Sequence, residues 1–436
     1  MSVSVIGAGL AGCEAAWQLA SRGIPVDLFE MKPKKYTPAH HYAGFAELVC
    51  SNSLKAARLE SAAGLLKEEM RMLGSLTLES AAQCTVAAGG ALAVDRIRFS
   101  DYITEKIRSH PLITVCEKEC TEIPEGFCIV ASGPLTSDAL AQTIANRLHT
   151  KGLSFYDAAA PIVTAESIDT SVAFAASRYG RGADDYYNCP MNKEEYERFY
   201  EALISAESAP LHTFDQDFSV YEGCMPVEVM ARRGMDTIRF GPLKPVGLRD
   251  PRTGHRPWAV VQLRRENAEG TLYNLVGFQT NLKFGEQKRV FSMIPGLQNA
   301  EFARYGVMHR NTFLDSPRLL DSAFRFKTEN RIFFAGQMTG VEGYMESAMS
   351  GILAGRNLNR ILHGKAPLKL PRETMCGALS AYISDPTVAD FQPMGANMGI
   401  LPAMDGHIRD KKQRYTALAQ RALAALGKVL KEEEEA

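Results

Sequence analysis

The chain has 436 residues, of which 46% are hydrophobic and 23% charged, a composition typical of a globular protein with two or three domains. Its formal net charge of −1 gives no overall basic signal for nucleic acid, so an RNA site has to be a local patch. No apolar run reaches the ~18 residues of a membrane helix. The first residues already read as a strand, so we expect no signal peptide. Nine scattered cysteines without C-x-x-C spacing favour reduced thiols in a cytoplasmic protein and indicate no metal site.

The first thirty residues predict a dinucleotide-binding unit made of a strand, a glycine turn, a helix and a second strand. In such a turn Gly7 permits the tight bend, Gly9 lets the backbone approach a pyrophosphate, and Gly12 lets the helix pack on the strand. The second strand ends in Glu30, 18 residues after Gly12, where a carboxylate can accept hydrogen bonds from a ribose. The expected phosphate-binding run at the helix N-terminus is Gly7, Ala8, Gly9, Leu10, Ala11 and Gly12.

The chain up to about residue 150 continues with alternating helical and strand patterns. In chain order we expect a helix at 62–73, a glycine turn at 89–90 leading into a helix at about 99–109, a strand at 112–116, a buried strand at 127–131 ending in a turn at Gly133, and a helix at about 137–148.

The pattern changes between residues 151 and 325, where prolines, aromatic residues and short strands predominate. A strand at 331–335 then runs into Gly336 and Gln337, and a helix of small residues follows. We therefore predict a discontinuous first domain, residues 1–150 and 326–436, with residues 151–325 inserted as a substrate- or RNA-binding domain. A basic amphipathic helix at about 409–432 precedes an acidic tail that we expect to be disordered.

This order of segments resembles the FAD-binding fold of the glutathione-reductase type. The closing strand, turn and helix come more than 300 residues after the first strand, whereas a nicotinamide-binding domain closes its sheet much earlier. The resemblance implies that Gly336 and Gln337 contact the ribityl–phosphate region and that the helix after Gly343 points its N-terminus at the flavin. The expected class is α/β, a Rossmann-like FAD-binding domain with an inserted α+β domain.

Several longer blocks of the chain carry a second, narrower resemblance. They are residues 7–12, 45–53, 89–96, 221–231, 240–247, 305–312 and 334–344. These blocks are similar, in order and over almost the whole chain, to the folate- and FAD-dependent tRNA (uracil-5-)-methyltransferase family. The resemblance implies 5,10-methylenetetrahydrofolate as the one-carbon donor, FADH2 as carrier and reductant, NADH or NADPH as the source of electrons, and 5-methyluridine at T-loop position 54 of tRNA as the product. No obligatory protein partner is evident.

Other functions remain open at this stage. A related flavoprotein family that modifies the tRNA wobble uridine shares the Ala-Gly-Gln segment, but its chains are much longer and its cysteine motif reads Cys-Asn-Pro, where this chain has Cys50-Ser-Asn-Ser. The same methylation chemistry on ribosomal RNA is a second alternative. A flavin-bearing RNA chaperone and a general NAD(P)H oxidoreductase are the alternatives from other functional classes.

Methylation of uracil C5 requires a thiolate that adds at C6, because this addition places negative charge on C5. Cys224 is followed by Pro226 and Glu228, which predict a helix start whose positive end favours thiol ionisation. Cys50 precedes residues 51–53, a second predicted helix start near the cofactor. The resemblance implies that both cysteines are catalytic. We favour Cys224 as the nucleophile, and Cys50 then handles the C5 proton or shields the flavin. The other seven cysteines fit buried structural thiols.

Further candidates flank the expected flavin site and the insertion. His309 and Arg310 could contact substrate or flavin, although a structural histidine is the simpler interpretation. Tyr344 and Glu346 could stack on the folate or hold its amine, although residues at a helix start often only pack or cap.

The RNA-binding surface is predicted from a run of basic residues in the insertion. Trp258 and Phe240 lie close to this run and could stack on a flipped base. A solvated basic face is the simpler interpretation, and the C-terminal basic helix is a second candidate. The proposed phosphate contacts are Arg232, Arg233, Arg239, Lys244 and Arg264.

Overall fold

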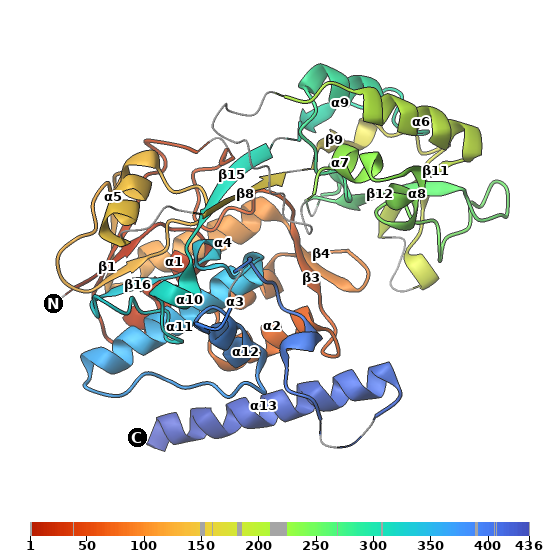
Figure 1. Cartoon of the computed structure of the whole chain (residues 1–436). Helices are drawn as coiled ribbons and strands as arrows, with labels where there is room; N and C mark the ends of the chain where they lie inside the picture. The colour runs from red at the N-terminus through yellow and green to blue at the C-terminus, as the bar shows by residue number, and fades with distance from the viewer. Residues whose placement is uncertain are drawn as a thin grey trace.

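Two sheets with separate hydrophobic clusters build the molecule, as the computed structural model in Figure 1 shows. One part holds the N-terminal sheet and the C-terminal helices. The other holds most of the insertion, at the upper right of the view. The structure describes residues 2–37, 39–148, 153–158, 160–180, 185–209, 225–267, 269–306, 308–388, 391–404, 406 and 408–435.

The first part is organised around a five-stranded parallel sheet in the order β16-β7-β1-β2-β6. The late strand β16 pairs with β7 next to the N-terminal strand, as the sequence order of an FAD-type fold requires. This arrangement confirms the α/β, Rossmann-like class. The carboxyl ends of all five strands meet at one edge, where such folds bind ligands. The strands are β1 (Val3–Ile6), β2 (Val26–Glu30), β6 (Ile113–Glu117), β7 (Cys128–Val130) and β16 (Ile332–Phe334).

Helices α1 (Leu10–Ala20) and α11 (Tyr344–Leu362) cross at very short range because small residues face each other. A Cβ on Gly351 would lie 2.1 Å from the carbonyl oxygen of Ala11, and one on Gly355 would lie 2.8 Å from that of Ala15. Backbone therefore packs on backbone, which fixes the first residue of α11 relative to the glycine turn before α1.

Two buried glutamates join the remaining helices of this part. The Glu14 carboxylate accepts the backbone N–H groups of Leu76 and Thr77 at the start of α3, at 3.1 and 2.9 Å. Glu69 accepts those of Met375 and Cys376 at the start of α12, at 2.7 and 2.8 Å. Carboxylates in these places satisfy helix N-termini that no solvent reaches. The helices are α2 (Ala62–Met72), α3 (Leu76–Gln83), α4 (Arg96–Ser109), α5 (Asp138–Leu148), α10 (Ser316–Leu319) and α12 (Met375–Tyr382).

The insertion forms a six-stranded sheet in the order β10-β11-β12-β13-β9-β14, and helices α6, α7, α8 and α9 lie in the same lobe. The elements are β9 (Ile162–Thr164), β10 (Phe174–Ala175), β11 (Tyr186–Met191), β12 (Ala259–Arg265), β13 (Leu272–Leu275), β14 (Phe302–Arg304), α6 (Lys193–Ser205), α7 (Val227–Arg232), α8 (Met235–Phe240) and α9 (Phe284–Phe291).

Two strands run between the lobes as an antiparallel pair, β8 (Leu153–Ala158) and β15 (Met308–Phe313). The chain therefore leaves the first part through β8 and returns to it through β15, and these two strands lie side by side. The apolar residues just after β15, including Leu319 and Phe324, belong to the hydrophobic cluster of the parallel sheet. The domain boundaries at 150, 151, 325 and 326 remain a prediction.

The secondary structure predicted from local sequence was wrong at two turns. Residues 51–53 do not start a helix, because β3 (Ser53–Ala56) pairs with β5 (Ala91–Val94), and β5 also pairs with β4 (Thr85–Val86). The turn at 89–90 likewise leads into β5 and not directly into a helix. Helix α4 begins only after Asp95, whose carboxylate accepts the N–H groups of Ile97 and Arg98.

The expected disorder of the acidic tail was also wrong. Helix α13 (Lys411–Glu435) continues through it, along the lower edge of the view in Figure 1. Glu433 forms an ion pair with the mostly buried Arg356 and lies 3.5 Å from Arg360. Apolar side chains of α13 such as Leu418 and Leu426 join the main cluster. No helix within the described ranges is long and apolar enough to cross a membrane.

We expect Gly351→Ala to lower the free energy of unfolding by about 1–3 kcal/mol, because its Cβ would overlap the Ala11 carbonyl and force α1 and α11 apart. Chemical denaturation measures this change. Gly285→Ala on α9 is the matched control, since a Cβ there meets nothing within 4 Å. Because alanine is the better helix former, the control should be neutral or stabilising. Equal effects of the two variants would contradict the close crossing.

Candidate functional site

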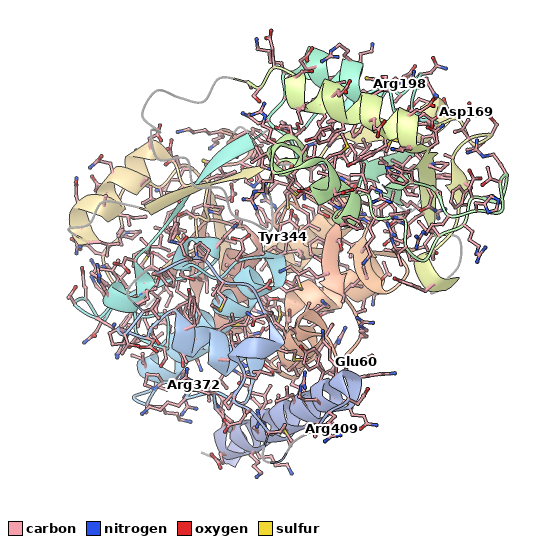
Figure 2. The ribbon with its side chains drawn as sticks, turned by 45° about the vertical axis from the view of Figure 1, so that its right-hand side comes forward. Glu60, Asp169, Arg198, Tyr344, Arg372 and Arg409 are labelled. Carbon is pink, nitrogen blue, oxygen red and sulfur yellow. The ribbon has the colours of Figure 1, made fainter. Side chains whose placement is uncertain are left out.

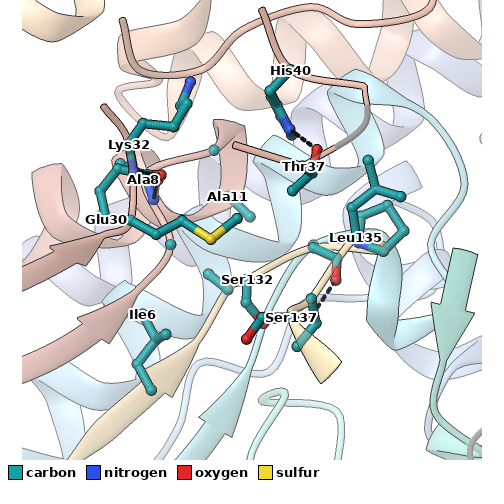
Figure 3. A pocket seen from close by; sticks show the side chains of 18 of the residues that line it. Ile6, Ala8, Ala11, Glu30, Lys32, Thr37, His40, Ser132, Leu135 and Ser137 are labelled. Atoms are coloured by element: carbon teal, nitrogen blue, oxygen red, sulfur yellow. Dashed lines mark hydrogen bonds between the residues drawn. The ribbon is translucent and has the colours of Figure 1, made fainter. Parts of the chain in front are cut away.

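A pocket lies at the carboxyl edge of the parallel sheet and is lined by segments far apart in the sequence. They include the turn and start of α1 at 6–11, the end of β2 and the residues after it at 29–32, residues 118–120 after β6, the turn after β7 at 131–137, and Gly336, Gln337, Tyr344 and Ser347. In Figure 3, Glu30 and Lys32 lie on one side of the pocket and Leu135 on the other. The sequence predicted the glycine turn, Glu30 and the turns at Gly133 and Gly336 separately, and the structure brings them together around one pocket.

The glycine turn fits the role predicted for it. Gly7 has a φ of +97°, and a Cβ there would lie 2.6 Å from the Ala131 carbonyl oxygen. A Cβ on Gly12 would lie 1.7 Å from the Gly7 carbonyl oxygen, so the helix start can sit on the turn only without a side chain. A Cβ on Gly9 would meet nothing within 4 Å, and no side chain caps α1 there. The uncapped start of α1 thus opens onto the pocket, which suits a pyrophosphate.

Glu30 ends β2 at the pocket and is buried, with 8% of its surface exposed. Its two carboxylate oxygens accept the backbone N–H groups of Ala8 at 2.8 Å and Lys32 at 2.9 Å. These bonds fix the carboxylate beside the glycine turn. Since a carboxylate offers about four acceptor sites, it can still bind ribose hydroxyls.

The far end of the pocket is formed by the turn before α11. The Gly336 N–H donates to Ser350 Oγ at 2.6 Å, and the Gln337 side chain donates to Glu342 at 2.6 Å. Gly343, at the N-cap of α11, has a φ of +120°, and a Cβ there would lie 2.3 Å from Glu346 Oε2. The pocket thus extends from the Glu30 carboxylate to the N-terminus of α11. This donor set fits the expected FAD.

Tyr344, the first residue of α11, brings Cys50 to this end of the pocket. Figure 2 places Tyr344 near the centre of the molecule, where the two lobes meet. Its hydroxyl oxygen accepts the backbone N–H groups of Cys50 at 2.8 Å and Ser51 at 3.2 Å, and lies 2.9 Å from Cys50 Sγ. With both lone pairs of the hydroxyl used, its hydrogen is left to donate to the sulfur. Burial, and then the charge of Cys50, raise the pKa of Tyr344, so the hydroxyl keeps this hydrogen.

The other candidates near the flavin turn have different surroundings. Glu346 is buried and pairs with Lys55 at 2.9 Å, and it accepts the Ala396 N–H at 2.9 Å. This places Glu346 in an ion pair within the first part of the chain. His309 and Arg310 lie on β15, opposite Asp157 and Tyr156 of β8.

Cys224 lies outside the residues that the structure describes. The helix predicted after it is present as α7, which begins at Val227, and Glu228 stands in its first turn. Every cysteine in the described part of the chain is a free thiol. Burial raises the pKa of Cys128 and Cys376, and that of Cys189 to about 12, as expected for structural thiols. The described residues contain no cluster of His, Cys, Asp or Glu arranged to hold a metal ion.

The predicted RNA-binding residues divide into two groups. Arg232, Arg233 and Lys244 are exposed, and the Arg239 guanidinium lies 3.8 Å from the centroid of the Trp258 ring. Arg264 was wrongly assigned to this surface, because it is only 7% exposed. Its guanidinium donates instead to the side-chain oxygens of Ser51 and Asn52, the two residues that follow Cys50.

Sequence reasoning missed the other polar and charged groups around Cys50. Arg96 and Asn52 stand in two of the blocks that carry the family resemblance, yet neither received a role. Arg304, which donates to the Val49 carbonyl, has no local signal at all. Only the docking of the insertion against the first part reveals it.

Comparisons with known proteins agree on one family. Residues 2–366 match the family model described as glucose inhibited division protein A. The methylenetetrahydrofolate--tRNA-(uracil-5-)-methyltransferase TrmFO of Enterococcus faecalis is 58% identical over 428 residues, covering 98% of each chain. That of Acetivibrio thermocellus is 60% identical over 431 residues, covering 99% of this chain and 98% of the relative. Among solved structures, GidA of Aquifex aeolicus is similar in fold, with a TM-score of 0.70 at 17% identity, covering 100% of this chain and 76% of that one.

Glu30→Ala should lower the affinity for FAD by about tenfold or more, because it removes a charge-assisted acceptor for the ribose and releases the Ala8 N–H. Flavin absorbance per mole of purified protein, followed by titration of the stripped protein with FAD, measures the loss. Glu117→Ala is the control, since Glu117 is the register partner of Glu30 on β6 and pairs with Arg108. Normal FAD affinity in Glu30→Ala would remove Glu30 from the cofactor site.

Proposed function

The chain belongs to the TrmFO family of methylenetetrahydrofolate–tRNA-(uracil-5-)-methyltransferases, and on this basis we propose that it forms 5-methyluridine at T-loop position 54 of tRNA. The observation that carries the proposal is the Cys50–Tyr344 pair, whose tyrosine lines the pocket at the end expected for the flavin, in a chain whose similarity to these enzymes extends over 98% of its length. A thiol held beside a flavin site is what uracil C5 chemistry requires.

The cofactor set follows from the same site. The first-turn amides of α1 and the Glu30 carboxylate would hold the diphosphate and ribose of FAD, and the turn before α11 would hold its ribityl end. When bound, the reduced flavin supplies the hydride, NADH or NADPH supplies its electrons, and 5,10-methylenetetrahydrofolate supplies the carbon.

The cysteines divide the remaining chemistry between them. The Cys224 thiolate adds to uracil C6 and makes C5 nucleophilic, and C5 then bonds to the one-carbon unit as the π bond from that carbon to its carrier nitrogen opens onto the nitrogen. Cys50 takes the C5 proton as the remaining bond from the carbon to the carrier nitrogen breaks, which leaves a methylene group on C5. Addition of a hydride to this methylene gives the methyl group, and the electron pair that returns to the ring expels the Cys224 thiolate from C6. A hydrogen bond from Tyr344 favours the thiolate form of Cys50 that this role needs. Tyr344 therefore orients and tunes the Cys50 thiolate.

The exposed basic residues of the insertion would contact the tRNA backbone. Phe240 is 65% exposed and Trp258 36% exposed, and the Arg239 guanidinium lies 5.0 and 3.8 Å from the centroids of their rings. Such aromatic and arginine faces stack on unpaired bases, and the exposed Arg232 nearby can neutralise a phosphate. Loop nucleotides of a T-arm offer both unpaired bases and phosphates.

Label transfer tests this function. With methylene-labelled tetrahydrofolate, NAD(P)H and an unmodified tRNA transcript, we expect labelled 5-methyluridine in the T-loop. Cys50→Ala and Cys224→Ala should abolish it, and Tyr344→Phe should lower kcat by about tenfold through the lost hydrogen bond to sulfur. Tyr382→Phe on helix α12 is the matched control, because its hydroxyl donates to the Gln392 carbonyl, away from Cys50. Label only in ribosomal RNA, or none at all, would overturn the proposal.

Charge reversal tests the RNA surface separately. Arg232→Glu should weaken tRNA binding by about three- to tenfold at moderate salt and flatten its salt dependence, because one phosphate contact is lost. The exposed Arg372 in the first part of the chain, at the lower left of the view in Figure 2, provides the control Arg372→Glu. Filter binding across a salt series measures both. Identical salt slopes for the two variants would contradict this surface.

A further inference from the structure

The short segment Leu48–Asn52, which carries Cys50, is held by buried polar side chains from both parts of the molecule. It has no regular secondary structure of its own. Its conformation therefore depends on the side chains that bind its backbone and its polar groups.

The first part of the chain holds one side of the segment. Arg96, at the start of α4, donates to the carbonyl oxygens of Leu48 at 2.6 Å and Val49 at 3.2 Å. Tyr344 accepts the next two N–H groups along the segment. These contacts leave the side chains of residues 51 and 52 for other partners.

The insertion supplies those partners. Arg264 on β12 donates through Nη2 to Ser51 Oγ at 2.7 Å and through Nε to Asn52 Oδ1 at 2.9 Å. Arg304 on β14 donates to the carbonyl oxygen of Val49. Arg304 therefore binds the segment just before Cys50, and Arg264 binds it just after Cys50.

Asn52 completes the junction. It is fully buried, and its amide nitrogen donates to Val94 O at 3.1 Å in the first part. The same nitrogen lies 3.0 and 3.3 Å from the carbonyl oxygens of Arg265 and Glu266 in the insertion. One side-chain amide thus joins the Cys50 segment to both lobes.

Charged and titratable groups of the described residues face Cys50 from both lobes. Among them are the guanidinium groups of Arg96, Arg264 and Arg304, the carboxylate of Glu266, which pairs with Arg96, and the hydroxyl of Tyr344. Burial lowers the pKa of Arg264 and Arg304, yet an arginine remains charged in proteins. Among these groups positive charge exceeds negative charge, which favours a thiolate over a thiol.

We propose that Arg264 and Arg304 are positioning residues that hold the Cys50 segment from the insertion and supply much of the positive charge around its thiol. Cys50 takes its reactive position only when the insertion is docked on the first part. The inference rests on the proposed role of Cys50 in methyl transfer, and it adds that the domain assigned to RNA binding also assembles the thiol site.

Cysteine alkylation tests this without using methyl transfer. The purified flavin-loaded protein is pulsed with iodoacetamide between about pH 6 and 10, and the modified Cys50 peptide is quantified by mass spectrometry. For Arg264→Met we expect the pH midpoint of the Cys50 reaction to rise by about one unit, because one positive charge is lost. Arg264→Lys keeps the charge but cannot make both hydrogen bonds, so its midpoint should stay near that of the unchanged protein while its kcat for methylation falls without a matching change in KM.

Arg178→Met is the matched control. Arg178 is a partly buried arginine of the insertion that, like Arg264, donates two hydrogen bonds, here to Gln262 on β12 and to the Val246 carbonyl, away from Cys50. Its Cys50 profile should not change. Arg304→Met repeats the test if Arg264→Met does not fold, as judged by thermal unfolding and flavin content.

Unchanged midpoint and limiting rate in both Arg264→Met and Arg304→Met would overturn the proposal. An equal shift in Arg178→Met would also overturn it, because the effect would then be general loosening of the insertion. Absence of methylation by the unchanged protein would reject the proposed function and leave the alkylation result interpretable.

Discussion

The close crossing of α1 and α11 is the constraint on which the rest of the site depends. Gly351 and Gly355 let one helix backbone reach the other, so the N-termini of both helices meet the same edge of the parallel sheet. A dinucleotide needs the first helix end for its phosphates, and a flavin ring needs the second. Tyr344 reaches Cys50 because it is the first residue of that second helix.

Electrostatics at the junction of the lobes is the second constraint. Three arginines and one glutamate in a largely buried cluster are costly to desolvate, and hydrogen bonds to backbone carbonyls and side-chain oxygens, together with the ion pair between Arg96 and Glu266, offset part of this cost. Cys50 lies in this cluster. The same contacts that join the lobes therefore set the surroundings of the thiol.

The sequence predicted local chemistry well where the backbone itself imposes it. The glycine turn, Glu30 and the turn at Gly336 lie in one pocket as expected, since each marks the end of a strand in a parallel sheet. Prediction failed where distant partners decide the outcome. Residues 51–53 carry polar side chains typical of a helix start, but they pair with β5 and with the insertion instead. The tail shows the same limit, because an ion pair between Glu433 and Arg356 and the apolar face of α13 keep an acidic run helical.

By itself, the sequence determined the fold class, the family and the dinucleotide turn, because strand and helix periodicity, glycine spacing and long matching blocks are properties of contiguous residues. Only the tertiary structure decided which charges surround Cys50. Arg264 looked like a phosphate ligand because it stands among surface arginines in the sequence, yet its side chain turns to residues 51 and 52. Arg96, Arg264 and Arg304 lie far apart along the chain, and no local pattern can show that their guanidinium groups converge on one segment.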